Sequence, residues 1–293
     1  MRIALPLSLL AALCMPRAIA AEPLAKEQRE ASIRYVQGLR NADGGFRASG
    51  STGPSTLGST SSSLRALKYL GAGVTDPQRT AAFIAACAHP SGGLADVPGG
   101  APDVRTTAVG LMALVELHGP RLRESVKLEP IVGYLETNAR AIPELYIAAA
   151  ALDAAGLKTA RAPEWLAAFE ATRNADGTFG KGVGDTAGAA ITALRLGRTV
   201  NDPAATAASL KAAQRPDGGF AGMGEASDLG STYRVMRALW MLREKPDVAR
   251  LRAFVARCRN ADGGYGAGPG QPSGASPTYY ASIVLKWADE MEK

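Results

Sequence analysis

The sequence is poor in the residues that most metal sites and nucleophilic sites require. Its 293 residues include three cysteines and two histidines, and no Cys-x-x-Cys pair occurs. Cys87, Cys258, His89 and His118 show no metal-ligand spacing, so no pattern supports a zinc site among them. Cys87 and Cys258 each follow an apolar helical stretch. This favours buried free thiols over the disulfide that an exported protein could form.

Aromatic residues and basic clusters are scarce as well. Aromatics make up 6% of the chain, whereas hydrophobic residues make up 46%, mostly alanine and leucine. This balance favours close-packed helices over sheets. The net charge is +6, and no run of lysine and arginine with interleaved aromatics is present. We therefore expect no nucleic-acid partner.

The first twenty residues differ from the rest of the chain. Residues 3–15 are apolar at all but two positions, and Ala18-Ile19-Ala20 has the small-x-small pattern of a cleavage site. This is typical of a secretory signal peptide over residues 1–20, with an anchored N-terminal helix as the alternative. We expect cleavage near Ala20, an exported (periplasmic or secreted) protein with no stable membrane span, and a single domain over residues 21–293.

A glycine-rich turn recurs throughout the remaining chain. It reads RNADGGF at 40–46, HPSGGL at 89–94, RNADGTF at 173–179, RPDGGF at 215–220 and RNADGGY at 259–265. The interval is roughly 45 residues, except for one gap of about two intervals, where residues 138–157 supply a degenerate unit. The sequence therefore predicts six repeating units.

Each unit has an amphipathic first helix, the turn, a polar loop and a second helix. The second helices are predicted at 59–71, 103–119, 185–197, 228–242 and 276–288, and they are rich in small residues on most faces. First helices carry more charge; Arg250, Arg252 and Arg257 fall off the apolar stripe of the last one. We therefore predict an all-α fold, an α/α toroid of six helical hairpins with second helices inside, first helices outside and a central cavity. An open solenoid is the alternative.

The turn residues have a mechanical explanation. The aspartate can accept hydrogen bonds from backbone amides ahead of it, and the glycines reach positive φ without a Cβ penalty. Asp103, Asp185 and Asp228 each open a second helix, where an acid acts as an N-cap or favours the helix dipole.

The whole unit resembles a known repeat. FVARCRNADGGYGAGPGQ followed by SPTYYASIVL is similar to the repeat of protein prenyltransferase β subunits and of squalene and other triterpene cyclases. The resemblance covers nearly the whole chain after residue 20. It implies the toroid fold, and it is less specific for the reaction.

The resemblance also implies where prenyltransferase chemistry would lie. That family holds zinc with an aspartate, a cysteine two residues later and a histidine opening the next inner helix. Here Asp228 is kept, but Gly230 and Pro277 occupy the other two positions. Gly222 and Glu225 stand where the family places cations for a diphosphate. We therefore predict no metal and no cofactor, with zinc only in a rearranged site.

The cyclase pattern is incomplete in the same way. Its Asp-x-Asp-Asp proton donor corresponds here to Gly182, Gly184 and Asp185, so a single acid remains. The donor that terpene cyclases use is therefore absent.

Three functions remain open. The favoured one is a diverged toroid that binds an apolar, isoprenoid-like ligand or a protein partner in its cavity without zinc chemistry. The second is a farnesyl- or geranylgeranyltransferase-like or cyclase-like enzyme with a rearranged site. The third is a carbohydrate-active toroid that uses Asp103, Asp185 and Asp228 as catalytic acids. The candidate cavity residues are Tyr146, Tyr233, Trp240, Tyr279, Tyr280, Arg105, Arg234 and Arg237. Ordinary packing or a solvated helix end is the alternative for each.

Overall fold

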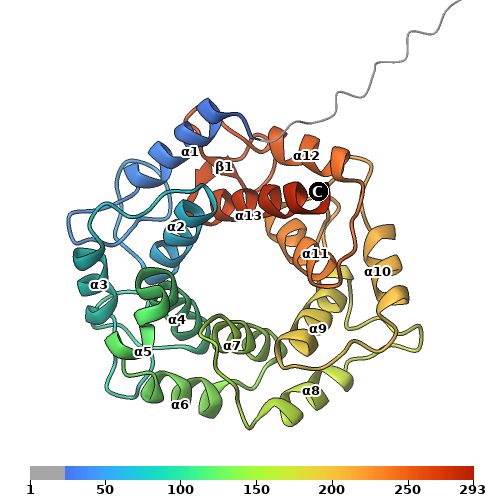
Figure 1. Ribbon diagram of the computed structural model, residues 1–293, viewed down its shortest axis with the longest axis horizontal. Coiled ribbons are helices and arrows are strands. Elements are labelled where there is room, and N and C mark those ends of the chain that lie inside the picture. The colour runs from blue at the N-terminus through green and yellow to red at the C-terminus, as the bar shows by residue number, and fades with distance from the viewer. Residues whose placement is uncertain (1–23) are drawn as a thin grey trace, which may run out of the picture.

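The computed structural model describes residues 24–293, and its helices form two concentric rings (Figure 1). The outer ring consists of α1 (Lys26–Gly38), α3 (Pro77–Ala86), α6 (Glu129–Asn138), α8 (Ala162–Glu170), α10 (Pro203–Ala212) and α12 (Val248–Arg257). The inner ring consists of α2 (Leu57–Tyr69), α4 (Val104–His118), α7 (Ile142–Ala154), α9 (Val183–Arg195), α11 (Leu229–Met241) and α13 (Ala275–Met291). The predicted signal peptide lies outside the described residues.

Four short elements complete the fold. They are η1 (Gly119–Arg121), α5 (Leu122–Ser125), β1 (Tyr265–Gly266) and β2 (Ser273–Gly274). The two strands pair with each other as a minimal antiparallel ribbon in the last loop, and the other regular elements among residues 24–293 are helices. Among the described residues, none of the helices has the length and apolarity needed to span a membrane.

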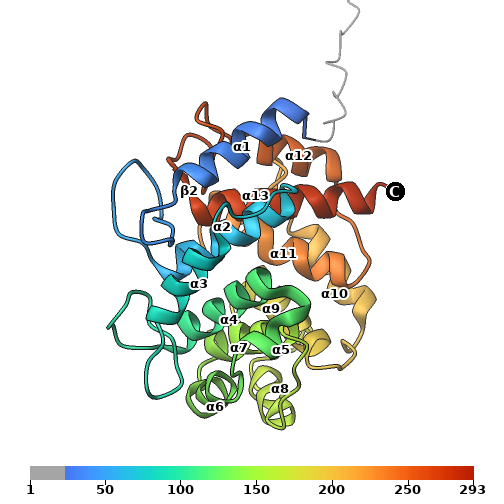
Figure 2. The ribbon, with the colours of Figure 1, turned by 60° about the vertical axis from the view of Figure 1, so that its left-hand side comes forward.

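The ring is closed. α13 packs against α11 on one side and against α2, at the other end of the chain, on the other side (Figures 1 and 2). The toroid prediction is confirmed, and the open solenoid is wrong. The division of the helices follows their composition, because inner helices must pack on several sides. α7, for example, buries the run of alanines at 148–151.

The hydrophobic core lies between the two rings. Its fully buried aromatic side chains come from both rings and from the turns, and include Phe46, Trp165, Phe220, Phe254 and Tyr265. Each residue that follows a glycine turn donates its backbone N–H to a threonine hydroxyl of the next inner helix. These pairs are Phe46–Thr60, Leu94–Thr107, Phe179–Thr186, Phe220–Thr232 and Tyr265–Thr278, at 2.9–3.1 Å. The threonines thus satisfy amides that would otherwise be buried without a partner.

The turn aspartates act as the sequence predicts. Asp43 Oδ1 accepts hydrogen bonds from Gly45 N at 2.9 Å and from Ser55 Oγ at 2.8 Å. Asp217 and Asp262 make the same pair of bonds in their own units. One carboxylate therefore fixes both the turn and the loop that leads into the inner helix.

The first turn glycine serves as a joint between successive hairpins. Gly44, Gly92, Gly218 and Gly263 all have φ near +90°. A Cβ built on any of them would lie 2.0–2.5 Å from a backbone carbonyl oxygen of the next outer helix. Gly177 has a similar φ of 83°, yet nothing lies within 4 Å of its Cβ position. The glycine is thus required for close approach at four turns and for conformation alone at the fifth.

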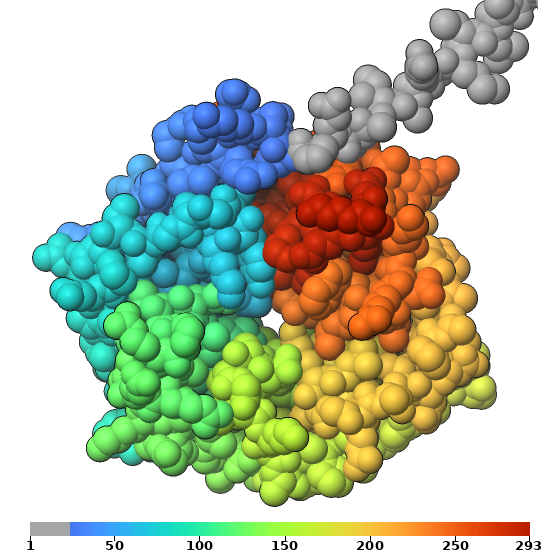
Figure 3. Space-filling model, viewed as in Figure 1, coloured from blue at the N-terminus to red at the C-terminus, as the bar shows by residue number. Residues whose placement is uncertain are grey.

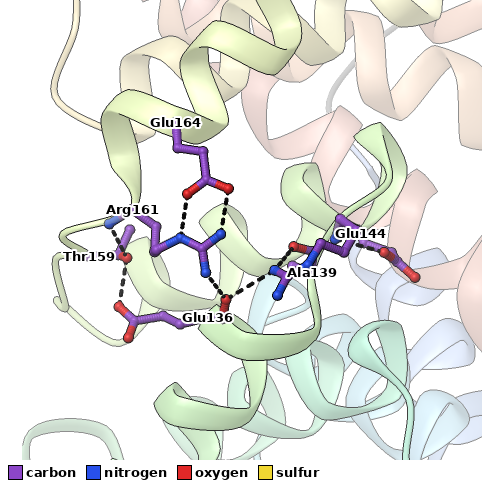
Figure 4. A network of polar contacts seen from close by, with 7 residues as sticks. Glu136, Ala139, Glu144, Thr159, Arg161 and Glu164 are labelled. Carbon is purple, nitrogen blue, oxygen red and sulfur yellow. Dashed lines mark hydrogen bonds and ion pairs between the residues drawn. The ribbon is translucent and has the colours of Figure 1, made fainter.

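The degenerate unit uses a different connection. α6 and α7 are joined by a three-residue linker without a glycine turn. Here the end of α6 is tied to the start of α8 by a polar network (Figure 4). Arg161 Nη1 donates to Glu136 O at 2.6 Å, Thr159 Oγ1 donates to the Glu136 carboxylate at 2.6 Å, and Arg161 also pairs with Glu164. Polar contacts therefore stand where other units use glycine packing.

Candidate functional site in the central channel

The inner helices all run in the same direction, which gives the ring two different mouths. Leu57 N, Leu229 N and Ala275 N, at the starts of α2, α11 and α13, donate to carbonyl oxygens in the loops that precede neighbouring inner helices. The starts of these helices therefore share one end, which we call the N-terminal mouth. Figure 3 shows that side chains narrow the ring to a small central opening.

The opposite end, the C-terminal mouth, is bordered by polar pairs between neighbouring inner helices. Lys68 and Glu116 join α2 to α4 at 2.6 Å. The Trp240 indole N–H donates to Glu290 at 2.9 Å and joins α11 to α13. Trp240 is 39% exposed, which is unusual for a tryptophan. Beside it, Arg243, Lys245 and Met291 help to line a surface pocket of about 480 Å³.

The three candidate acids lie at the N-terminal mouth and are engaged with their own helices. Asp103 caps α4 by accepting from Thr106 N at 2.7 Å, and Asp228 caps α11 by accepting from Ser231 N at 2.8 Å. Asp185 lies in the first turn of α9 and accepts from Lys181 N at 2.9 Å. Asp103 and Asp228 are therefore N-cap residues, whereas Asp185 holds the loop that leads into α9, whose own N-cap is Gly182.

A column of six aromatic rings runs from the C-terminal mouth along the inner ring. In order of contact it comprises Trp240, Trp287, Tyr233, Tyr280, Tyr279 and Tyr69. Neighbouring ring centroids lie 4.7–6.1 Å apart, and most pairs are stacked. The Tyr279 hydroxyl also donates to the Tyr233 hydroxyl at 3.0 Å. Tyr69 belongs to α2 and the other five rings to α11 and α13, so ring closure is what brings Tyr69 to the column.

Arginines lie against this aromatic column. Arg65 stacks on Tyr279 at 4.2 Å, and Arg237 lies 4.7 Å from the Trp287 ring and 5.2 Å from the Tyr233 ring. Such cation–π contacts hold a guanidinium but do not neutralise it. No carboxylate within residues 24–293 forms an ion pair with Arg65 or Arg237.

A third guanidinium belongs to the same cluster. Arg195, at the end of α9, has a side chain that is 6% exposed, and its Nε lies 3.6 Å from Asp153, too far for a hydrogen bond. We call Arg65, Arg195, Arg237 and Tyr233 the arginine–tyrosine cluster.

The positive charges of this cluster act together on the hydroxyl group of Tyr233. Burial disfavours the phenolate of Tyr233, but the positive charges of Arg237, Arg65 and Arg195 outweigh burial and lower the pKa of Tyr233 to about 7. The neighbouring Tyr279 responds in the opposite direction, since burial dominates there and raises its pKa. Tyr233 is thus the tyrosine of the channel on which negative charge is best stabilised.

The inner face of α9 is bare at two glycines one helical turn apart. A Cβ added at Gly184 would lie 3.7 Å from Arg234 Nη1, and one added at Gly188 would lie 3.8 Å from the Tyr146 ring. Arg234 and Tyr146, from the two helices that flank α9, meet above these glycines with the guanidinium 5.3 Å from the ring. The two glycines therefore leave room for the Arg234–Tyr146 pair against α9.

Comparison with known proteins gives the family. The model of the prenyltransferase alpha-alpha toroid domain matches residues 7–192 and 132–293. The chain belongs to the prenyltransferase α/α-toroid family. No curated protein matches this family member in sequence.

Solved structures share the toroid fold at low sequence identity. A protein from Actinoplanes superposes with a TM-score of 0.64 at 16% identity, covering 90% of this chain and 99% of that one. Geranylgeranyltransferase-I of Candida albicans, complexed with GGPP, gives 0.61 at 14%, covering 79% and 83%. A variant of the type II terpene cyclase MstE from Scytonema, in complex with geranylgeranyl dihydroxybenzoate, gives 0.62 at 12%, covering 91% and 97%.

The zinc position of the prenyltransferase family does not fit the residues of this toroid. The Asp228 carboxylate is occupied in capping α11. A side chain at Gly230 would begin 3.1 Å from that carboxylate, but glycine offers no ligand atom, and Pro277 offers none either. Among residues 24–293, histidine, cysteine and acidic side chains form no group of three that could hold a metal ion.

The cysteines are placed as expected in this prenyltransferase-family toroid. Cys87 and Cys258 are buried and free, each at the C-cap of an outer helix. Burial raises the pKa of Cys87 to about 11 and that of Cys258 to about 12. Both thiols therefore stay protonated near neutral pH and act as small apolar side chains.

The predicted cavity residues of the toroid fall into two groups. In the first group, on the inner helices, Tyr233 contacts Tyr279, Tyr280 and Arg237, and Arg234 contacts Tyr146. Trp240 lies at the C-terminal mouth, and Arg105 is exposed beside the capping residue Asp103 at the other mouth.

Four members of the channel were missed from the sequence. They are Arg65, Tyr69, Arg195 and Trp287. Arg65 and Tyr69 are four residues apart on a helix of small residues, and this spacing on one face was the available signal.

Proposed function

We propose that this protein binds an apolar, isoprenoid-like ligand in its central channel, without the zinc chemistry of the prenyltransferases. The aromatic column carries this proposal. Its half-buried rings Tyr69, Tyr233 and Tyr280 lie on inner helices, pack against the buried Tyr279 and Trp287, and are suited to an unsaturated hydrocarbon chain. Two proteins of the same fold have geranylgeranyl compounds in their structures. The capped acids and the absent zinc ligands argue for binding over transfer.

A channel-blocking variant tests the proposal. Gly188→Leu would project a side chain past Tyr146 into the channel, since nothing but that ring lies within 4 Å of the Cβ position. We expect wild-type protein to bind geranylgeraniol, followed by tryptophan fluorescence, and Gly188→Leu to weaken binding at least about tenfold, which is about 1.4 kcal/mol. Gly133→Leu is the matched control on the outer ring, where the Cβ position is also free. It is expected to bind like wild type.

Three results would contradict the proposal. One is equal binding by wild type and Gly188→Leu, which would place the ligand outside the channel. Another is stoichiometric zinc in the purified protein together with prenyl transfer to a cysteine-containing acceptor peptide. That result would establish the alternative function, a prenyltransferase-like enzyme with a rearranged site. A protein partner as the occupant of the channel would leave geranylgeraniol unbound by every variant.

Export is part of the proposal and rests on the first twenty residues. If residues 1–20 act as a signal peptide, expression of the full chain in a bacterial host yields an exported protein whose intact mass is that of a chain starting at Ala21. Intact-mass measurement of the periplasmic and cytoplasmic fractions tests this. Full-length protein confined to the cytoplasm would argue against export.

A further inference from the structure

The arginine–tyrosine cluster holds more positive charge than its surroundings neutralise. Arg237 Nε and Nη2 are buried without a hydrogen-bond partner. Arg65 has one polar contact, from Nη1 to the Met112 sulfur at 3.4 Å, which is a weak acceptor. Buried donors of a charged group normally have hydrogen-bond partners, because a buried donor without a hydrogen bond costs free energy. The missing partner should therefore be an anion with several acceptor atoms.

The position of the cluster separates it from the diphosphate position of the family. Arg237 lies nine residues after Asp228 on α11, about 13 Å further along the helix axis. The family position itself has Gly222 and Glu225, and no cation among them. The unpaired guanidiniums thus lie towards the C-terminal mouth, beyond Asp103, Asp185 and Asp228.

The charge of the cluster indicates what would bind. Arg195 is balanced in part by Asp153, whereas Arg65 and Arg237 have no carboxylate partner among residues 24–293. Guanidiniums pair in a planar, bidentate way with phosphate oxygens. The aromatic column beside them suits the hydrocarbon part of the same molecule, and Trp240 marks the mouth nearest to both.

We propose that Arg65, Arg195, Arg237 and the Tyr233 hydroxyl form a binding site for the dianionic phosphate group of an amphiphile that enters through the C-terminal mouth. This inference rests on the proposed function, since the hydrocarbon part occupies the channel described above. The phosphate oxygens accept from the unpaired Nε and Nη2 of Arg237 and from the guanidinium of Arg65. No covalent step is involved.

Tyr233 gives the site a measurable property. The charged and titratable groups around it are Arg237 on its own helix, Arg65 and Tyr69 on α2, Tyr146 on α7, Arg195 on α9, and Tyr279 and Tyr280 on α13. Without a ligand, the phenolate can act as the counter-ion of the arginines. An entering phosphate dianion takes over that role and raises the pKa of Tyr233, so the hydroxyl gains a proton.

The test compares three probes on the whole protein: farnesyl monophosphate, farnesol and inorganic phosphate. We expect farnesyl monophosphate to bind more tightly than farnesol by about 10- to 100-fold, as a charge-assisted hydrogen bond is worth about 1.5–3 kcal/mol. Arg237→Met should remove this difference, so that the variant binds farnesyl monophosphate and farnesol with similar affinity. Arg105→Met, at the N-terminal mouth, should change neither.

Near neutral pH, farnesyl monophosphate should also reduce the tyrosinate absorbance of wild type. Tyr233→Phe should bind the probe without this signal. Equal binding of farnesyl monophosphate and farnesol, or a loss of phosphate preference in Arg105→Met and not in Arg237→Met, would overturn the inference while the proposed function stands. Failure of farnesol to bind would instead contradict the proposed function. If inorganic phosphate alone binds as tightly as farnesyl monophosphate, the site binds a free anion, and the inference that its ligand is an amphiphile is overturned.

Discussion

Gly218→Ala is expected to destabilise the protein by about 3 kcal/mol, and Gly177→Ala by about 1 kcal/mol. Both glycines lie at the same place in their turns, with φ of 89° and 83°. An alanine therefore meets the same conformational penalty at either position. At Gly218, however, the new Cβ would lie 2.0 Å from the Arg250 carbonyl oxygen of α12, so the turn and the outer helix must move apart.

The comparison is measured by chemical unfolding of the two variants. A difference of about 2 kcal/mol would assign the excess cost to close packing between hairpins. Equal destabilisation would show that the joint contributes nothing beyond conformation. Gly44→Ala provides a second case, since its Cβ would lie 2.4 Å from the Arg79 carbonyl oxygen of α3.

The double variant Asp289→Asn, Glu292→Gln is expected to destabilise the protein by about 3 kcal/mol, more than Arg252→Met, for which we expect about 1 kcal/mol. Arg252 of α12 is 2% exposed and donates to Asp289 at 2.6 Å and to Glu292 at 2.7 Å. Its Nε and Nη1 have no partner, so the two carboxylates supply all of its polar contacts.

The asymmetry follows from which charge is left behind. Neutralising the two carboxylates leaves a buried guanidinium without a counter-charge, which costs free energy. Removing Arg252 leaves two carboxylates whose side chains are 33% and 48% exposed and can be hydrated, while methionine retains most of the packing. Thermal or denaturant unfolding of the three proteins at one pH measures both effects. A larger loss for Arg252→Met would mean that packing of the arginine stem, and not its charge, stabilises this contact.

Arg252 also marks a limit of the sequence analysis. Periodicity placed it off the apolar stripe with Arg250 and Arg257. The structure buries Arg252 nonetheless, because helical spacing records which face a residue occupies and not what a neighbouring helix brings to it. The acids that receive Arg252 lie at the end of α13, outside any repeat motif.

The frame of the molecule was more predictable than its channel. The repeated turns could be predicted, because Asp43 and its equivalents accept hydrogen bonds from residues close to them in the sequence. The channel combines residues that lie far apart in the chain, such as Arg65 and Trp287, and neither belongs to a motif. Tyr233 and Arg237 could be predicted from the sequence, because one helical turn separates them on a single inner helix. The low pKa of Tyr233 could not, because it depends on three helices together.

Ring closure has a consequence for how the protein unfolds. A Cβ on Gly263, in the last turn, would lie 2.5 Å from the Ala31 carbonyl oxygen of α1, so the last hairpin meets the first at a glycine joint like the others, and Ser32 Oγ donates to Gly263 O at 2.7 Å. Linear repeat arrays can fray from a terminal repeat that has one neighbour. Here each hairpin has two, so the first hairpin to detach must break two interfaces. The architecture thus favours a single cooperative transition over stepwise loss of repeats.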